Sequence, residues 1–441
     1  MSLEDIKDKH ARPEVGKAMH EFIRDLYPIC RSITGEGVRE TLRLVQKRIL
    51  LEVHEVPTGT QVFDWTVPYE WNVRDAYVAN MRGERVIDFR KSNLHVVNYS
   101  RPVSARMKLE DLMSHIYSLP EKPDWIPYRT SYYKEHWGFC LTHRQYQALQ
   151  DEEYDVCIDS SLIPGSLTYG ECYLPGHTQN EVLLSCHVCH PSLCNDNLSG
   201  IAVATFLMEA LRGRSLRYSY RVLMAPGTIG SITWLACNQD RVGHIKHGLV
   251  LACIGDPGRF TYKKSRRGTA EIDKVVAHIL KHRDPKARIL EFSPYGYDER
   301  QFCSPGFNLP VGCLMRTPHG EFPEYHTSAD NLDLVTPEAL RESLSGLLSI
   351  VSALEANKTY RNTNPNCEPQ LGRRGLYRSI GGTDSGKLEL ALLWVLNQSD
   401  GRTSLLDIAE RAELDFEVAK RAADDLIEHG LLQEVVGQKC P

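Results

Sequence analysis

Residues 181–200, EVLLSCHVCHPSLCNDNLSG, constrain the fold of this chain more than any other stretch. The run Val182–Leu184 has the composition of a short buried strand, and the apolar run IAVATFLMEAL after Gly200 has that of a buried helix. A strand, a polar loop and a helix place reactive side chains at the carboxyl edge of an α/β sheet. The loop holds imidazole, thiol and carboxylate groups within ten residues: His187, Cys189, His190, Cys194 and Asp196. Imidazole and carboxylate together predict a site for a zinc-like ion.

A second polar cluster, YHTSAD at residues 325–330, lies in a loop before an expected helix at 336–357. It contains His326 and Asp330. A single histidine is more often structural than a metal ligand, so His187 alone would not indicate a metal. Asp196, however, stands between two asparagines directly before a helix, where a carboxylate can both cap and coordinate. The two clusters together predict one site built from both loops.

Strands and helices alternate along most of the chain. Strands are expected at 154–159, 166–172, 181–185, 220–225, 248–254 and 288–292, and helices at 14–50 (two), 200–212, 231–240, 271–282 and 336–357. This alternation predicts an α/β fold with a mixed, mostly parallel sheet covered by helices on both faces.

A chain of 441 residues is too long for one average domain. We expect an α/β domain of residues 1–65 and 139–382, interrupted by a small β-rich domain at 66–138 that is rich in Trp, Tyr and Pro. Residues 383–441 read as helices at 387–397, 404–411 and 415–429 followed by a short strand pair at 431–437, which is the outline of a winged helix.

Charge and composition limit the partners. The net charge of −5 gives no general attraction to nucleic acid or to an anionic membrane. The segment 415–429 holds five acids against Lys420 and Arg421, so a packing or dimerisation role, and with it a homo-oligomer, is expected rather than DNA binding. The chain shows no signal-type segment and no apolar run of about 18 residues, and it has 13 cysteines, an odd number. We therefore expect a cytoplasmic protein with free thiols and no membrane contact.

These motifs resemble a known family. NDNLSG with an upstream histidine, a strand–turn–GS–helix element near residues 220–240 and the late YHTSAD cluster resemble the zinc exopeptidases of aminopeptidase type. The resemblance is closer to a bacterial group of aminopeptidase-like proteins that carry an HxCHPSxxNDNLSG loop, an inserted β-rich module and a winged-helix tail. It covers essentially the whole chain, and it implies a mixed α/β sheet that carries a zinc site.

The resemblance also implies roles for single residues. It assigns the first histidine ligand to His187, the bridging carboxylate to Asp196, an aspartate ligand to Asp256 and the last histidine ligand to His326. Side chains expected behind these ligands are Cys189, His190, Asp298 and Asp330.

The chain departs from the active peptidases at two places. Pro226-Gly227-Thr228 stands where they have two consecutive glutamates, one the general base and the next a zinc ligand. Cys189 stands where an aspartate orients the first histidine, although a cysteine thiolate can itself bind zinc. We therefore expect one zinc ion rather than two. Replacement candidates for the base are Glu299, Glu321 and Glu324, although a solvated loop charge is the favoured interpretation of each.

Two functions follow from these residues. The first is a zinc-dependent hydrolase of aminopeptidase type that acts on an amide bond of a small peptide or modified amino acid. The alternative is a zinc protein of the same fold that has lost its catalytic glutamate at position 227 and serves as a binding or assembly module. Two further sets of side chains are candidates for the substrate pocket, although the arginines fit ordinary surface positions at least as well, and the aromatic residues fit the core of a small β module or an oligomer contact equally well. They are the loop arginines Arg266, Arg267, Arg300 and Arg316, and the aromatic residues Trp65, Trp71, Trp125, Tyr128, Tyr132 and Tyr133 of the β-rich segment.

Overall fold

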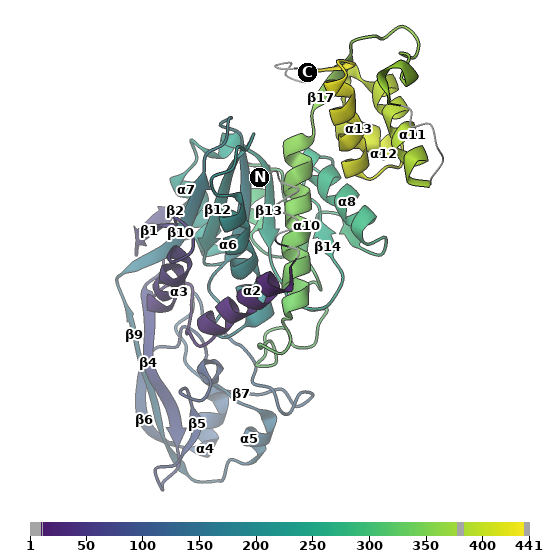
Figure 1. Cartoon of the computed structure of the whole chain (residues 1–441). Helices are drawn as coiled ribbons and strands as arrows, with labels where there is room; N and C mark the ends of the chain where they lie inside the picture. Colours follow the sequence, from purple (N-terminus) through teal and green to yellow (C-terminus); the bar gives the residue numbers. More distant parts are fainter. Residues whose placement is uncertain (1–9, 11, 377–382, 436–441) are drawn as a thin grey trace.

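The structure is a computed structural model that describes residues 10, 12–376 and 383–435. An eight-stranded mixed sheet forms its centre, in the order β1-β10-β12-β11-β13-β16-β14-β15 (Figure 1). The middle strands β12, β11, β13 and β16 are parallel, whereas β1, β10 and β14 pair antiparallel at the sides, as a mixed sheet requires. The bounds are β1 (Glu52–Pro57), β10 (Ser166–Leu174), β11 (Glu181–His187), β12 (Ser219–Ala225), β13 (Ile245–Leu251), β14 (Thr261–Lys263), β15 (Arg288–Leu290) and β16 (Val311–Met315).

Strand β11 lies inside this sheet, and all of its residues are buried. Val182 and Leu184 belong to one apolar core, and Leu183 belongs to another on the opposite face. Burial on both faces explains why the strand reads as a continuous apolar run. The first core includes residues of helices α2, α3, α6, α8 and α10, and the second includes residues of α7 and α9. The prediction of helices on both faces of the sheet is therefore confirmed. The bounds are α2 (Pro13–Leu26), α3 (Glu36–Gln46), α6 (Ser199–Leu211), α7 (Ile229–Cys237), α8 (Glu271–Arg283), α9 (Glu299–Phe302) and α10 (Pro337–Ala356).

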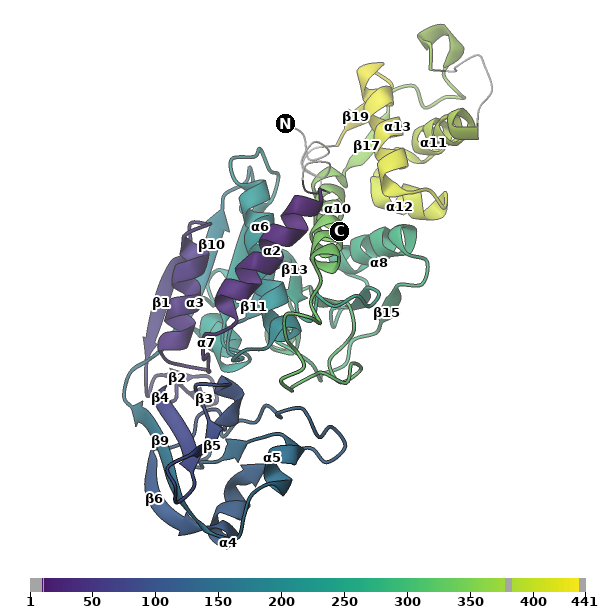
Figure 2. The same ribbon diagram turned by 60° about the horizontal axis from the view of Figure 1, so that its bottom comes forward.

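Helix α10 ties the first layer together. It begins at Pro337, a residue suited to the first turn, and the Thr336 side chain accepts a hydrogen bond from the Ala339 N–H at 3.1 Å. The helix packs against α2, α6 and α8 (Figure 2). Of the helices in the described part of the chain, none is both long and apolar enough to cross a membrane.

The β-rich segment forms a separate four-stranded sheet in the order β5-β4-β9-β6, below the large sheet in Figure 1. Strand β9 pairs antiparallel with β4 and β6, so the prediction that residues 154–159 form a strand of the large sheet is wrong. Its residues alternate between buried and partly buried, as in a strand with one covered face. The β-rich sheet therefore continues past residue 138. The bounds are β2 (Gln61–Val62), β3 (Trp65–Thr66), β4 (Glu70–Ala79), β5 (Arg85–Asp88), β6 (Val103–Lys108), β7 (Ile116–Tyr117), β8 (Phe139–Cys140), β9 (Glu153–Ile163), α4 (Leu109–Leu112) and α5 (His143–Gln147).

In its described residues, the C-terminal part has the α-helices α11, α12 and α13 and a three-stranded sheet in the order β18-β17-β19. Strand β17 precedes residue 383 and pairs with both β18 and β19, so the sheet of this part begins before the expected boundary. Within the described residues 431–435 of the expected strand pair at 431–437, the structure has one strand, β19, whose partner is β17; residues 436 and 437 lie outside the described residues. The bounds are β17 (Thr359–Asn362), α11 (Thr383–Gln398), β18 (Asp400–Ser404), α12 (Leu405–Arg411), α13 (Phe416–Glu428) and β19 (Leu432–Glu434).

Arg221 of β12 is a buried cation between carboxylates of both neighbouring strands. Its Nη1 donates to Glu171 at 2.8 Å and its Nε donates to Glu181 at 2.7 Å. Replacing Arg221 by Met leaves two buried carboxylates without their cation, and we expect the free energy of unfolding to fall by about 3–5 kcal/mol. Urea denaturation measures this loss. Arg106→Met breaks an exposed pair with Asp155 and should cost less than about 1 kcal/mol; equal losses would contradict the account.

Candidate metal centre

The motif NDNLSG joins the start of α6 to the end of β13. The Asn197 Nδ2 donates to the Leu251 carbonyl oxygen at 2.8 Å, and the Asn195 Oδ1 accepts from the main chain beyond β13. The Ser199 hydroxyl accepts a hydrogen bond from that same segment at 3.1 Å. A Cβ at Gly200 would lie 2.5 Å from the Leu251 oxygen, so only glycine allows this approach. The motif therefore holds Asp196 rigidly at the carboxyl edge of the sheet, where open α/β sheets bind ligands.

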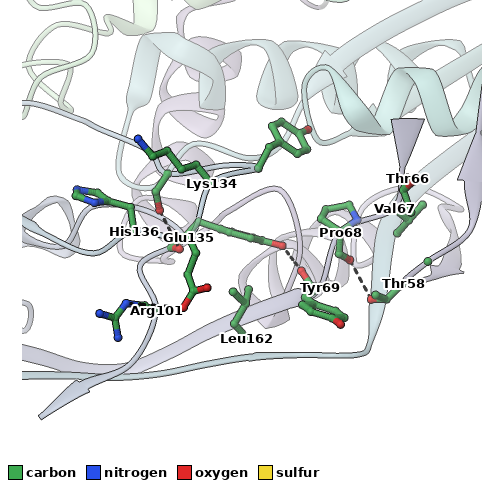
Figure 3. Close-up of a pocket in the computed structure, with 14 residues that line it drawn as sticks. Thr58, Thr66, Val67, Pro68, Tyr69, Arg101, Lys134, Glu135, His136 and Leu162 are labelled. Atoms are coloured by element: carbon green, nitrogen blue, oxygen red, sulfur yellow. Dashed lines mark hydrogen bonds and ion pairs between the residues drawn. The ribbon is translucent and has the colours of Figure 1, made fainter. Parts of the chain in front are cut away.

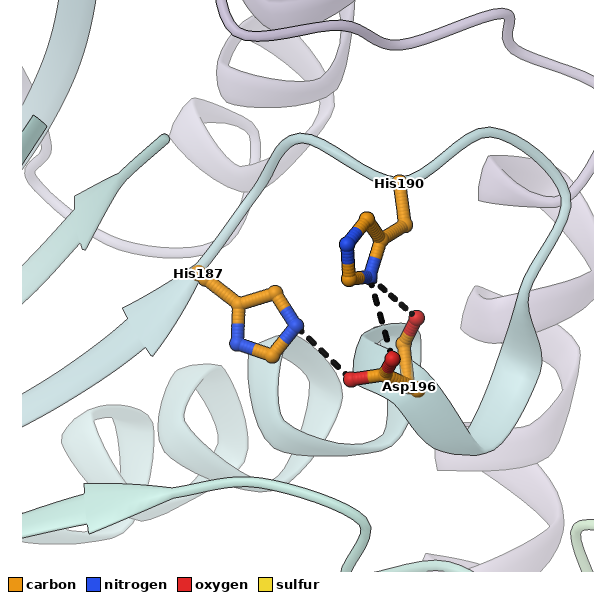
Figure 4. Close-up of side chains that lie close together, drawn as sticks. All are labelled: His187, His190 and Asp196. Atoms are coloured by element: carbon orange, nitrogen blue, oxygen red, sulfur yellow. Dashed lines mark hydrogen bonds and ion pairs between the residues drawn. The ribbon is translucent and has the colours of Figure 1, made fainter. Parts of the chain in front are cut away.

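Three histidines converge on the Asp196 carboxylate. The Nε2 of His187, the last residue of β11, lies 2.8 Å from Oδ1, and the Nδ1 of His190 lies 3.2 Å from Oδ2 (Figure 4). From the loop between β16 and α10, the Nε2 of His326 lies 3.0 Å from Oδ2. The side-chain exposure rises from 0% for Asp196 to 3% for His187, 14% for His190 and 36% for His326, so the cluster opens toward solvent on the His326 side.

The protein supports this cluster from behind. The Asp330 carboxylate accepts hydrogen bonds from the main-chain N–H groups of Asn195 at 2.6 Å and Asp196 at 3.0 Å. Asp330 thus orients the loop and does not touch the histidines directly. His326 itself has a left-handed φ of 54°, an unfavourable conformation of the kind that accumulates at functional sites. Burial raises the pKa of the Asp196 carboxyl, but His190 and His187 outweigh burial and hold this pKa well below its usual range.

Asp256, the expected aspartate ligand, has a different environment. Its carboxylate accepts hydrogen bonds from the Thr317 hydroxyl at 2.6 Å, the Gly258 N–H at 2.7 Å and the Asn195 side chain at 3.1 Å. The carboxylate is therefore occupied by loop contacts, and Asp256 is not part of the group formed by His187, His190 and Asp196.

A cavity of about 230 Å³ lies over the cluster, lined by His187, His190 and His326 together with aromatic residues. The Tyr297 ring stacks on His187 at 5.1 Å between ring centroids, and the Tyr325 ring stacks on His326 at 4.0 Å. These two tyrosines were not among the expected site residues, although both flank expected ones in the sequence, next to Asp298 and His326. The cavity thus combines a polar floor with aromatic walls.

The β-rich segment contributes one wall of the site. The Tyr128 ring meets the His190 and His326 rings edge-on, with centroids 5.1 and 5.2 Å away, and the Tyr128 N–H donates to the His326 carbonyl oxygen at 2.8 Å. The Tyr128 hydroxyl lies 2.8 Å from that of Tyr132. By contrast, Trp71 is a core residue whose Nε1 donates to the Ser100 carbonyl oxygen at 2.8 Å. Of the six expected aromatic residues, Tyr128 is thus the one with ring contacts to the histidines.

Gly227 packs tightly against the cluster. A Cβ added to Gly227 would lie 3.1 Å from the His187 Cβ and 3.7 Å from the Asp298 Oδ1. Asp298 lines the same cavity, and its Oδ1 accepts a hydrogen bond from the Ser231 hydroxyl at 3.0 Å. Burial raises the pKa of Asp298 to about 7. A carboxylate therefore reaches the cavity beside position 227, but it comes from another segment of the chain.

The three glutamates expected as base candidates lie elsewhere. Glu299 is fully buried in an ion pair with Lys263, and Glu321 pairs with Arg288 on the surface. Glu324 does not line the cavity among the residues that the structure describes. Asp298 is the only acidic residue among the described residues that line it.

Cys189 lies at the cavity without joining the cluster. Its Sγ is 3.8 Å from the Gly227 carbonyl oxygen, and burial raises the pKa of the thiol to about 12. The buried Nδ1 of His187 has no hydrogen-bond partner among the described residues, so no aspartate-like group orients this ring. The stacked Tyr297 ring and the Asp196 carboxylate at Nε2 are the contacts that orient it.

The donor set fits a zinc ion. Imidazole nitrogens of His187, His190 and His326 and the Asp196 carboxylate all approach one region, and tetrahedral zinc sites use histidine and carboxylate ligands in such numbers. Because the carboxylate of Asp196 contacts histidines through both oxygens, it is the centre of the arrangement.

Comparisons with known proteins agree with this geometry. Residues 20–357 match the family described as a domain of unknown function (DUF4910), and residues 358–434 match a winged helix-turn-helix family. Over 423 residues the chain is 53% identical to a Clostridium acetobutylicum protein named "Putative polysaccharide biosynthesis protein with aminopeptidase-like domain", with 96% of this chain and 97% of the relative covered.

Solved structures show the same relationship. The crystal structure of a "putative peptidase" from Clostridium acetobutylicum is 50% identical, with a TM-score of 0.94 and coverage of 98% of this chain and 100% of that one. A zinc aminopeptidase from Bacillus subtilis, only 10% identical, shares the fold with a TM-score of 0.56, covering 77% of this chain and 95% of its own. The expected fold class, the winged helix and the resemblance to aminopeptidase-like proteins are thereby confirmed.

Proposed function

Because the chain belongs to the family of the domain of unknown function DUF4910, and its fold is that of zinc aminopeptidases, we propose that it is a zinc-dependent hydrolase of aminopeptidase type. The observation that carries this proposal is the convergence of three imidazole nitrogens on the Asp196 carboxylate at the floor of a cavity. The proposed ligands of one zinc ion are drawn from His187, His190, Asp196 and His326. Asp256 is left out because its carboxylate accepts hydrogen bonds from loop groups.

The side chains around the cluster are assigned different roles in the proposed hydrolysis. A zinc ion held there supplies Lewis acidity, which polarises a carbonyl group and acidifies water. We assign the proton transfer to Asp298, because it lines the cavity next to position 227 and Ser231 holds its Oδ1 in place. The hydroxyl groups of Tyr297 and Tyr325 keep their protons at neutral pH, since burial raises the pKa of both. They are donors for an oxygen that gains charge as the amide is attacked.

Zinc-dependent turnover tests the proposal. The full chain, loaded with zinc, is expected to hydrolyse at least one substrate in a panel of aminoacyl 4-nitroanilides, dipeptides and N-acyl amino acids. The panel includes an N-acetylated hexosamine, because the name of the Clostridium relative refers to polysaccharide biosynthesis. Removal of zinc by a chelator should abolish turnover and added zinc should restore it. A zinc-loaded protein that hydrolyses none of these amides would contradict the proposal.

One observation favours the alternative function, a zinc protein that binds or assembles without catalysis. Gly227 and Thr228 supply neither carboxylate that the active peptidases have at this place. Under this alternative the zinc would be retained while turnover stays absent in the panel above. The role of Asp298 distinguishes the two functions. It is the only acidic residue among the described residues that line the cavity, and its carboxylate is able to replace the missing base.

We do not propose DNA binding for the winged helix. Helix α13 and its N-cap carry the acids Asp415, Glu417, Asp424, Asp425 and Glu428 against Lys420 and Arg421. A helix that enters a DNA groove needs the opposite balance to neutralise phosphates. Retardation of duplex DNA in a gel shift at low salt would contradict this.

A further inference from the structure

The loop arginines near the sheet edge have different surroundings. Arg266 and Arg267 both donate to Asn308, to its Oδ1 at 3.0 Å and to its carbonyl oxygen at 2.8 Å. Arg316 donates to a main-chain oxygen at 2.8 Å and pairs with a glutamate at 3.1 Å. Arg300 is the member of this set that lines the cavity over Asp196. These contacts leave Arg300 as the cation available to a ligand there.

Two buried nitrogens at this cavity lack a hydrogen-bond partner among the described residues. The Nε of Arg300 and the Nδ1 of His319 are shielded from solvent and have no hydrogen-bond partner among the described residues, and both residues line the cavity. The one carboxyl group of the cavity lining on which the Arg300 charge acts is that of Asp298, whose pKa the charge lowers. Burying a donor such as the Arg300 Nε without an acceptor costs free energy. A ligand that brings an acceptor removes this cost, and its binding is stabilised accordingly.

The charge at this place fits one class of ligand group. A guanidinium group pairs bidentately with a carboxylate or a phosphate. Burial lowers the pKa of His319, so its ring is neutral near pH 7 and adds no second positive charge. Arg300 therefore supplies a single positive charge at this place, which matches the single negative charge of a carboxylate. The cavity of about 230 Å³ also keeps this group close to the cluster.

We propose that Arg300, assisted by His319, is the subsite for a carboxylate of the substrate, so that the hydrolysed amide belongs to a short amino-acid derivative with a free carboxylate nearby. This rests on the proposed function and names its substrate class. The carboxylate has two possible sources, the C-terminus of a dipeptide or the side chain of an N-terminal acidic residue. The two sources share the same recognition chemistry, and separate substrates distinguish them.

Another cavity of the molecule shows why an unpaired arginine matters. A cavity of about 470 Å³ lies beside the β2–β3 hairpin, and the residues of the Asp196 cluster do not line it (Figure 3). It also contains an arginine, Arg101, but this side chain lies 3.9 Å from the Glu135 carboxylate, within the same cavity. The charge of Arg101 is thus balanced by a carboxylate of the protein. This cavity therefore offers an anionic ligand less than the cavity that Arg300 lines.

Matched substrates test the proposal in the zinc-loaded full chain. The ratio of kcat/KM is measured for L-leucylglycine against L-leucylglycinamide, and for L-glutamyl against L-glutaminyl 4-nitroanilide. We expect the charged member of one pair to be preferred about tenfold or more, which corresponds to about 1.4 kcal/mol. Arg300→Gln should bring that ratio close to one, mainly through KM, and Arg300→Lys should keep part of it. Arg266→Gln, the matched control outside the cavity, should leave the ratio unchanged.

A preference that survives in Arg300→Gln, or a wild-type protein that prefers both neutral partners, would overturn the proposal. Calorimetric titration separates its failure from that of the proposed function. If nothing is turned over, the proposed hydrolase fails. The subsite is still supported if the wild type binds L-leucylglycine more tightly than L-leucylglycinamide, or L-glutamate more tightly than L-glutamine, and if Arg300→Gln loses this difference. Equal binding of acid and amide in the wild type would overturn it. Melting temperatures of the variants check that both substituted chains are folded.

Discussion

Asp196→Asn is expected to lower the zinc affinity of the protein by roughly a hundredfold or more, because even residues behind the ligands typically contribute 10–100-fold. The substitution keeps the shape of the side chain but removes the one negative charge that all three histidines contact. Without it, only the imidazole groups remain, and a doubly charged ion loses its anionic partner. Elemental analysis of the protein after gel filtration, and competition with a chromogenic chelator, measure the loss.

Asp256→Asn is the matched control for this experiment. It changes a buried aspartate of the neighbouring loop whose oxygens accept from Thr317 and Gly258. We expect this variant to keep its zinc, although the neighbouring loop loses part of its hydrogen bonding. Unchanged zinc in Asp196→Asn would show that the cluster is not the metal site. Equal loss in both variants would return Asp256 to the ligand set that the family resemblance implies.

Asp298→Asn is expected to lower kcat by about 10²–10⁴-fold, the usual contribution of general-base catalysis, while the zinc content stays unchanged. The amide keeps the size of the side chain and its ability to accept a hydrogen bond from Ser231, but it cannot take a proton. Steady-state kinetics on the best panel substrate measure the change.

Glu321→Gln serves as the control for Asp298→Asn. Glu321 lies in an exposed pair with Arg288, away from the cavity, so its loss should change kcat by less than about twofold, in keeping with the small energy of surface ion pairs. If Glu321→Gln abolished turnover and Asp298→Asn did not, the assignment of the base would be wrong.

Local patterns in the sequence predicted the parts of the site that depend on neighbouring residues. The apolar run before His187 and the apolar run after Gly200 correctly predicted strand, loop and helix, since buried parallel strands and buried helices both read as unbroken apolar stretches. Asp196 and His326 were expected to meet because both lie in loops before helices, and the structure places them 3.0 Å apart.

Features that depend on chain geometry were beyond such reasoning. Cys253 has a left-handed φ of 48° just after β13, and its Sγ lies 2.9 Å from the Tyr297 hydroxyl, so the chain turns before it reaches Asp256. A residue count along the strand does not reveal this turn. Strand β9 was assigned to the wrong sheet because strand pairing is a long-range property. His190 was expected behind the ligands, and its Nδ1 lies 3.2 Å from Asp196 Oδ2, in direct contact with the carboxylate.

The central claim is that Asp196 and its histidines hold a zinc ion, and anomalous diffraction at the zinc absorption edge tests it most directly. For crystals of the zinc-loaded full chain, the account predicts one strong peak about 2.0–2.2 Å from the Asp196 carboxylate and from imidazole nitrogens of His187 and His326. A map with no peak at this cluster, or with its peak on other side chains, would contradict the account.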